Sequence, residues 1–210
     1  MKTLLFQGDS ITDCNRAREE MEDTRHTFLG SGYPALLAAR IYGEQPEKDW
    51  RIFNRGISGN RVVDLYARWK KDALNLRPDV LSILIGVNDT WHEYNSQNGV
   101  EVPRYEEFLR RLVTWTQEVL PDVKIVLMEP FVLPFGAVGE AWPAEIAQRG
   151  EVVRKAAADL GAVFVPLQEK FTEKAKQFGM EYWLRDGVHP TYAGHQLIAG
   201  QWMKYAGHLL

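Results

Sequence analysis

The feature that most constrains the fold is a regular alternation of short apolar segments with longer segments of helical spacing. Thr3–Gln7 is a short apolar run closed by Gly8, and Val80–Ile85 is another one closed by Gly86. Continuous apolar runs of this length are typical of buried parallel strands. The sequence therefore predicts five strands, over Thr3–Gln7, Trp50–Asn54, Val80–Ile85, Val123–Met128 and Ala162–Val165.

The segments between these strands carry helical patterns. The apolar residues of Arg61–Leu76 fall on one face of a helix, and Pro78 stops the pattern. Gly161 is placed as the C-cap of a helix that ends at Leu160. Helices are expected over Tyr33–Tyr42, Arg61–Leu76, Tyr105–Val119, Ala144–Leu160, Leu167–Phe178 and Thr191–Tyr205, and a long loop over 130–143.

This order of elements predicts an α/β fold. Parallel strands joined by helices need right-handed crossovers, which place helices on both faces of the sheet. We therefore expect a three-layer α/β/α sandwich around a five-stranded parallel sheet, with the flavodoxin-like strand order as the simplest choice. A length of 210 residues suits one well-buried core, and no repeat or linker-like tract divides the chain. We expect a single domain over residues 1–210.

Composition narrows the function classes. A net charge of −3 gives no reason to expect a nucleic-acid partner or an anionic membrane. A single cysteine, Cys14, excludes an internal disulfide and a multi-cysteine metal site, and we expect neither a metal nor a cofactor. The N-terminus reads as a strand and no membrane-span-length apolar run follows, so a cytoplasmic location is expected. Surface Trp and Tyr residues are compatible with a homo-oligomer.

Two segments far apart in the sequence contain the parts of a catalytic triad. Ser10 lies in Gly8-Asp9-Ser10, directly after the first expected strand, and Asp186 and His189 follow the last one. A serine hydroxyl needs a base within hydrogen-bond reach before it can attack an ester, and a histidine is a suitable base at neutral pH. Asp186 can hold the tautomer of His189 that presents its free nitrogen to Ser10.

The first three expected strand ends supply candidate donors for an oxyanion. These donors are the backbone N–H of Ser10, the backbone N–H of Gly59 and the side-chain amide of Asn88. Taken singly, each motif has an ordinary structural explanation, because Gly, Asp, Asn and Ser are common in turns and helix caps. Their occurrence together, at successive strand ends, favours the catalytic interpretation.

These four blocks resemble those of the SGNH hydrolases, the GDSL-type esterases and lipases. Ser10 lies in GDSIT, Gly59 in GISGN, Asn88 in IGVND and His189 in DGVHP; Ile11 replaces the usual leucine of the first block. The resemblance extends from the first strand to the last loop. It implies a three-layer α/β/α fold and serine esterase activity without a metal. No G-x-S-x-G elbow is present, which argues against the α/β-hydrolase fold.

Within this family, the segments around the four blocks look similar to cytoplasmic acetylxylan esterases. That resemblance implies a small-molecule ester substrate, most specifically an acetylated carbohydrate such as a xylo-oligosaccharide. Trp91, Tyr94 and Trp183 are candidate substrate-binding residues, because flat aromatic rings can stack on sugars; packing in the core is the alternative explanation.

Two other functions stay open at this point. The first is a short-chain acyl esterase, thioesterase or lysophospholipase with the same fold. The second is a flavodoxin-like phosphate-binding module, in which Ser10 and Thr12 would hold a phosphate at a helix N-terminus. This module would explain the first loop but would leave Asp186 and His189 without a role.

Overall fold

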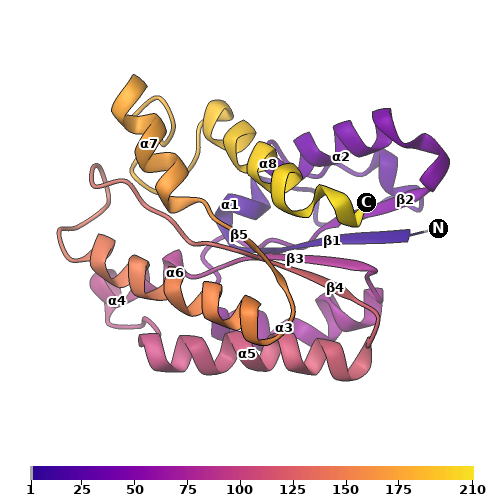
Figure 1. Cartoon of the computed structure of the whole chain (residues 1–210), viewed down its shortest axis with the longest axis horizontal. Coiled ribbons are helices and arrows are strands. Elements are labelled where there is room, and N and C mark those ends of the chain that lie inside the picture. The colour runs from indigo at the N-terminus through magenta and orange to yellow at the C-terminus, as the bar shows by residue number, and fades with distance from the viewer. Residues whose placement is uncertain (1) are drawn as a thin grey trace.

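All five expected strands form one parallel sheet in the computed structural model, which describes residues 2–210 (Figure 1). The strands are β1 (Lys2–Gly8), β2 (Trp50–Asn54), β3 (Val80–Leu84), β4 (Lys124–Met128) and β5 (Val163–Val165). Their order is β2-β1-β3-β4-β5, which is the flavodoxin-like order. The α/β sandwich predicted from the sequence is therefore confirmed.

Six helices correspond to the six expected ones: α2 (Tyr33–Glu44), α3 (Val62–Asp72), α5 (Val102–Val119), α6 (Trp142–Asp159), α7 (Gln168–Phe178) and α8 (Tyr192–Ala206). The second expected helix, Arg61–Leu76, is interrupted. The backbone leaves the α-helical region at Ala73, and a short 3₁₀ turn covers Leu74–Leu76. No helix among residues 2–210 combines the length and the apolar character that a bilayer-spanning segment requires.

Two helices were not expected. The four-residue helix α1 (Ser10–Asp13) and the ten-residue helix α4 (Val87–Ser96) directly follow β1 and β3. Asn88, which was expected in a loop, lies in the first turn of α4. The sequence shows no apolar helical stripe there because the buried residues of α4 are the consecutive and mostly polar 87–90.

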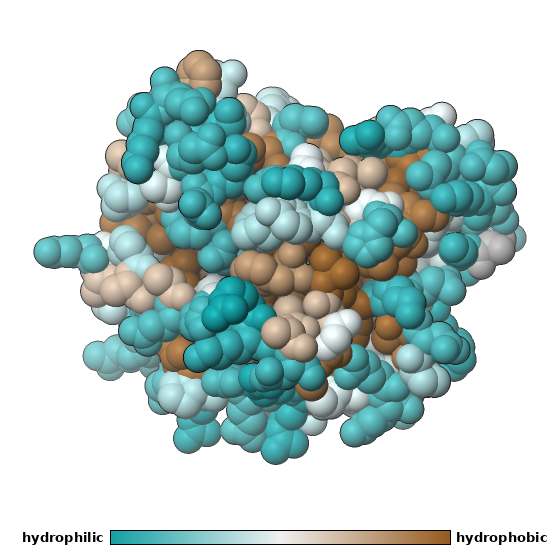
Figure 2. Space-filling view, viewed as in Figure 1, coloured by the Kyte–Doolittle hydropathy of each residue, from teal (hydrophilic) through white to brown (hydrophobic). Residues whose placement is uncertain are grey.

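The sheet separates two apolar cores, one under each helix layer. Alternate residues of a strand point to opposite faces, so Leu4 and Phe6 face the core beneath α2 and α8, whereas Leu5 faces the core beneath α3 and α5. Figure 1 shows the first pair of helices above the sheet and the second pair below it. In Figure 2 the helices present a mostly hydrophilic surface, and an apolar band runs between the two layers.

Parallel pairing brings the strand ends that carry the polar motifs to one edge of the sheet. Gly8, the last residue of β1, pairs with Leu84, the last residue of β3. Asn54, which ends β2, pairs with Phe6. The segments that begin at Asp9, Arg55 and Ile85 therefore emerge side by side at the carboxyl edge, where open α/β sheets build their sites.

Candidate active site

Ser10 occupies the first position of α1, directly after a tight exit from β1. The turn requires glycine at position 8, because a Cβ there would collide with the carbonyl oxygen of Leu84. The Asp9 side chain then caps α1 by accepting the N–H of Ile11 at 3.0 Å. Complete burial raises the pKa of Asp9 to about 7. This arrangement presents the Ser10 hydroxyl at the edge of the sheet.

Three side chains meet in a continuous hydrogen-bonded chain. Nε2 of His189 lies 2.9 Å from Oγ of Ser10, and Nδ1 of His189 lies 2.7 Å from Oδ2 of Asp186. A carboxylate can only accept, so Nδ1 carries the proton and Nε2 accepts from the serine hydroxyl. Burial acts to raise the pKa of Asp186, but hydrogen bonds from His189 and Val188 outweigh it and hold that pKa below its usual value.

The Asp186–His189 turn is held rigidly. Oδ1 of Asp186 accepts the backbone N–H groups of Val188 at 3.0 Å and His189 at 2.8 Å. Gly187 has φ +88° and lies against the loop that follows β4, so a side chain at this position would collide with the carbonyl of Phe135. The long loop over 130–143 therefore supports the turn that carries the histidine.

The three candidate oxyanion donors lie on three segments: Ser10 in α1, Gly59 in the loop before α3 and Asn88 in α4. Gly59 has φ +82°, and its carbonyl accepts a hydrogen bond from Nε2 of His92 at 2.9 Å. The Asn88 amide donates one hydrogen to the carbonyl of Asn60 at 3.2 Å, which leaves its second hydrogen available. Because residues 88 and 92 are one helical turn apart, α4 holds the Gly59 loop at two points.

The Gly59 loop is also tied to the nucleophile helix. Oδ2 of Asp13 accepts both the backbone N–H and the hydroxyl of Ser58 at 2.9 Å. Burial acts to raise the pKa of Asp13, but hydrogen bonds from Arg18 and Ser58 lower it below the usual value. The Asp13 carboxylate thus fixes the distance between the Ser10 helix and the Gly59 loop.

A cavity of about 630 Å³ opens beside Ser10 and His189. Its walls come from α1, the turn before α8 and the first part of α8, with polar groups prominent among them. The lining residues are Ser10, Cys14, Asn15, Ser31, Ser58, Arg185, Asp186, His189, Pro190, Thr191, Tyr192 and His195. Of these, Arg185 and Tyr192 are binding candidates that the sequence reasoning missed, since neither belongs to a motif.

The three aromatic residues expected to bind substrate lie outside this cavity. The Trp91 ring packs against His189 with centroids 5.6 Å apart, and against Trp142 at 5.3 Å. Tyr94 is exposed and stacks on Trp142, with ring centroids 6.0 Å apart. Trp183 is only 9% exposed and belongs to the core beneath α8. It is therefore a packing residue and not the substrate-binding residue expected from the sequence.

Cys14 lines the cavity but is poorly suited to act as a nucleophile. Nδ1 of His195 accepts the N–H of Tyr33 at 3.2 Å, so its Nε2 is the donor to the Cys14 sulfur, also at 3.2 Å. This histidine therefore has no free nitrogen to take a thiol proton. Burial raises the pKa of Cys14 to about 11 and lowers the pKa of His195 to about 4, which keeps both groups neutral.

Comparison with known proteins agrees with this geometry. The model of the GDSL-like lipase/acylhydrolase family matches residues 6–197. The chain belongs to this family. It is 38% identical over 208 residues to an acetylxylan esterase of Geobacillus stearothermophilus, covering 97% of this chain and 93% of that protein.

Solved structures of family members superpose closely. A GDSL-like lipase from Parabacteroides merdae matches with a TM-score of 0.91 and 41% identity, covering 100% of this chain and 96% of that one. The Geobacillus acetylxylan esterase matches with a TM-score of 0.88 and 38% identity, covering 97% and 93%. Catalytic mutants of that esterase replace a serine, an aspartate and a histidine by alanine.

The chain is thus a serine carboxylic-ester hydrolase with a Ser-His-Asp triad. This decides against the phosphate-binding module, which left the aspartate and the histidine unexplained. Among residues 2–210, no three His, Cys, Asp or Glu side chains converge in a way that would hold a metal ion.

Proposed function

We propose that this esterase removes acetyl groups from acetylated carbohydrate, with xylo-oligosaccharides as the substrate class, and that Ser10, His189 and Asp186 are its catalytic residues. The observation that carries the proposal is the hydrogen-bonded chain from Ser10 Oγ through the His189 ring to Asp186 Oδ2. The similarity to an acetylxylan esterase along almost the whole chain supports the substrate class.

In the first half of the reaction, Ser10 Oγ attacks the carbonyl carbon of the acetyl ester. Nε2 of His189 takes the hydroxyl proton as the new C–O bond forms. The imidazolium that results is stabilised by the Asp186 carboxylate, 2.7 Å from Nδ1. His189 then returns the proton to the sugar oxygen, the ester bond breaks, and an acetyl-serine remains.

The oxyanion of the tetrahedral intermediate needs donors in place beforehand. The Ser10 N–H lies in the first turn of α1, where helical N–H groups have no intrahelical partner. The Gly59 N–H and the second hydrogen of the Asn88 amide complete the set. Because Asn88 and Gly59 are connected through Asn60 and His92, these donors need little rearrangement during the reaction.

The second half repeats the same chemistry with water. His189 takes a proton from a water molecule as its oxygen attacks the acetyl carbon; the bond to Ser10 Oγ then breaks, His189 returns the proton to Oγ, and acetic acid leaves and ionises. Each step uses only the side chains described above.

The cavity beside Ser10 supports a carbohydrate as the alcohol part of the ester. A cavity of about 630 Å³ is much larger than an acetyl group needs and falls in the size range of sites for drug-sized ligands. Hydroxyl, amide and guanidinium groups in its wall can pair with sugar hydroxyls. We therefore assign this cavity to the sugar.

A hydrolysis panel tests the proposal. It compares acetylated xylo-oligosaccharides with p-nitrophenyl acetate, butanoate and octanoate, and the Ser10→Ala variant measures background hydrolysis. We expect kcat/KM to be highest for the acetylated sugar, because contacts remote from the ester contribute to transition-state binding. A preference for octanoate over acetate, or no gain from the sugar, would instead favour a short-chain esterase, thioesterase or lysophospholipase. Cytoplasmic location, a single-domain organisation and self-association stay predictions.

A further inference from the structure

We propose that Arg185 makes the cavity beside Ser10 a site for acidic sugars, so that the preferred substrate is an acetylated oligosaccharide bearing a uronic-acid carboxylate near the ester. This inference rests on the proposed deacetylase function and refines its substrate class. Its starting point is the charge of the cavity wall.

Among the described residues that line the cavity, two have charged side chains, Arg185 and Asp186. The Asp186 carboxylate is already occupied, because it accepts two backbone N–H groups and the His189 ring. Its negative charge is thereby paired with the catalytic histidine. The positive charge of Arg185 has no such partner among the described residues.

Arg185 differs in this respect from the arginines that brace the rest of the molecule. Arg55 pairs with Glu20, Arg61 with Asp64 and Arg149 with Glu145. Within residues 2–210, no carboxylate lies within 4.0 Å of the Arg185 guanidinium, although Arg185 directly precedes the catalytic aspartate. The cavity therefore offers an unmatched cation close to the reacting ester.

The guanidinium also acts on groups deep in the same wall. Burial is the main cause of the low pKa of His195, and the charge of Arg185 lowers it further. The same charge opposes the rise that burial causes in the pKa of Cys14. Cys14 and His195 thus both lie within the electrostatic range of Arg185, whose exposed side chain lines the same cavity.

A carboxylate is the group that matches this wall. A guanidinium presents parallel N–H donors that fit the two oxygens of a carboxylate, whereas a neutral sugar hydroxyl can take only one of them. Tyr192, 82% exposed at the rim of the cavity, adds a flat face against which a sugar ring can lie. Together these residues favour a sugar with an acidic side group.

The test compares two acetylated xylo-oligosaccharides of equal length, one neutral and one carrying a glucuronic-acid side group. The measured quantity is the ratio of their kcat/KM values, acidic over neutral, in which the amount of active enzyme cancels. We expect a ratio of about 5 for the unmodified enzyme at low ionic strength, as for one partly exposed ion pair. Salt at about 1 M should lower the ratio, because it screens exposed charges.

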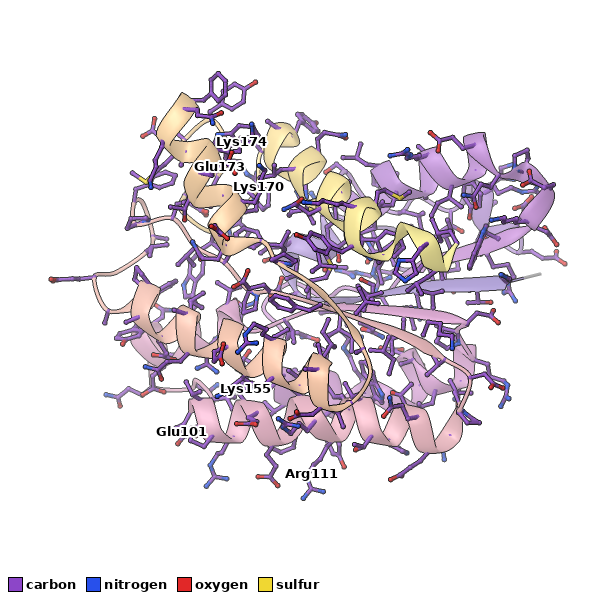
Figure 3. The ribbon with its side chains drawn as sticks, viewed as in Figure 1. Glu101, Arg111, Lys155, Lys170, Glu173 and Lys174 are labelled. Atoms are coloured by element: carbon purple, nitrogen blue, oxygen red, sulfur yellow. The ribbon has the colours of Figure 1, made fainter. Side chains whose placement is uncertain are left out.

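Arg185→Gln should bring the ratio to about 1, Arg185→Lys should retain part of the preference, and Arg185→Glu should bring the ratio below 1. Arg111→Gln is the matched control. It removes the same charge from the outer surface of α5, on the other side of the sheet from α8, and should leave the ratio unchanged (Figure 3). A second readout is competitive inhibition by the deacetylated acidic product, which Arg185→Gln should weaken about 5-fold.

Equal kcat/KM values for the two sugars, or a preference that survives in Arg185→Gln, would overturn this inference and leave the deacetylase proposal intact. If neither sugar is hydrolysed better than p-nitrophenyl acetate, the deacetylase proposal fails and the inference fails with it. The two failures are therefore distinguishable.

Discussion

Replacing Asp186 by asparagine should nearly abolish turnover while leaving the fold in place. In the structure, Oδ1 of Asp186 accepts two backbone N–H groups, those of Val188 and His189. An asparagine must keep its carbonyl oxygen there, since its NH₂ group cannot accept a hydrogen bond. The NH₂ group is consequently placed against Nδ1 of His189, where Oδ2 stood at 2.7 Å.

This placement selects the wrong tautomer of His189. An NH₂ donor opposite Nδ1 requires an unprotonated Nδ1, which leaves the proton on Nε2. The ring can then no longer accept the Ser10 proton, and the stabilising charge for the imidazolium is lost as well. A change of this kind in a serine hydrolase lowers kcat by about 10⁴, or about 5.5 kcal/mol of transition-state stabilisation.

The assay is steady-state hydrolysis of p-nitrophenyl acetate by each enzyme at the same concentration of folded protein. Thermal unfolding should change little, because the two backbone hydrogen bonds of the turn are kept. Asp159→Asn, at the exposed end of α6, is the matched control and should retain full activity. If Asp186→Asn keeps kcat within about tenfold of the unmodified enzyme, the tautomer argument is wrong.

Four further outcomes follow from the same geometry. Asn88→Ala should lower kcat by about 10²–10³ with little change in KM, since its amide acts on the oxyanion; a change confined to KM would make it a substrate-binding residue. Trp91→Ala should slow hydrolysis of sugar and nitrophenyl esters alike, because the indole contacts His189 and not the cavity; a loss restricted to sugar esters would return Trp91 to the sugar site. Cys14 should react slowly with iodoacetamide at pH 8, because burial raises its pKa to about 11; fast labelling would contradict the neutral pair with His195. Burial also raises the pKa of Asp9 from 3.8 to about 7, so between these pH values the folded state keeps a proton that the unfolded chain releases. As the pH rises from 4 to 8, the free energy of unfolding in urea should therefore fall for the unmodified enzyme relative to Asp9→Asn. A difference between the two enzymes that does not change with pH would contradict the raised pKa.

Much of the fold and the catalytic centre could be predicted from the sequence. The expected strand Trp50–Asn54 has the same bounds as β2, because Asp49 and Arg55-Gly56 flank a short segment rich in large apolar residues. Ser10 could be selected because it directly follows β1, and Asp186 and His189 could be selected because their spacing suits a histidine base held by a carboxylate. The alternation of elements along the chain therefore determined both the layered fold and the edge at which the site forms.

The tertiary structure alone decided what surrounds the triad. Helix α4 was missed because its buried face is mostly polar. The buried Asp89 of that face accepts the N–H of Val62, which is 27 residues away in sequence. Trp183 and Tyr192 are both aromatic residues close to His189 in sequence, yet one is in the core and the other is exposed at the cavity rim. Local periodicity reports which residues share a face of their own element. The shape and charge of a cavity depend instead on which side chains of distant segments meet, and only the packed chain specifies that.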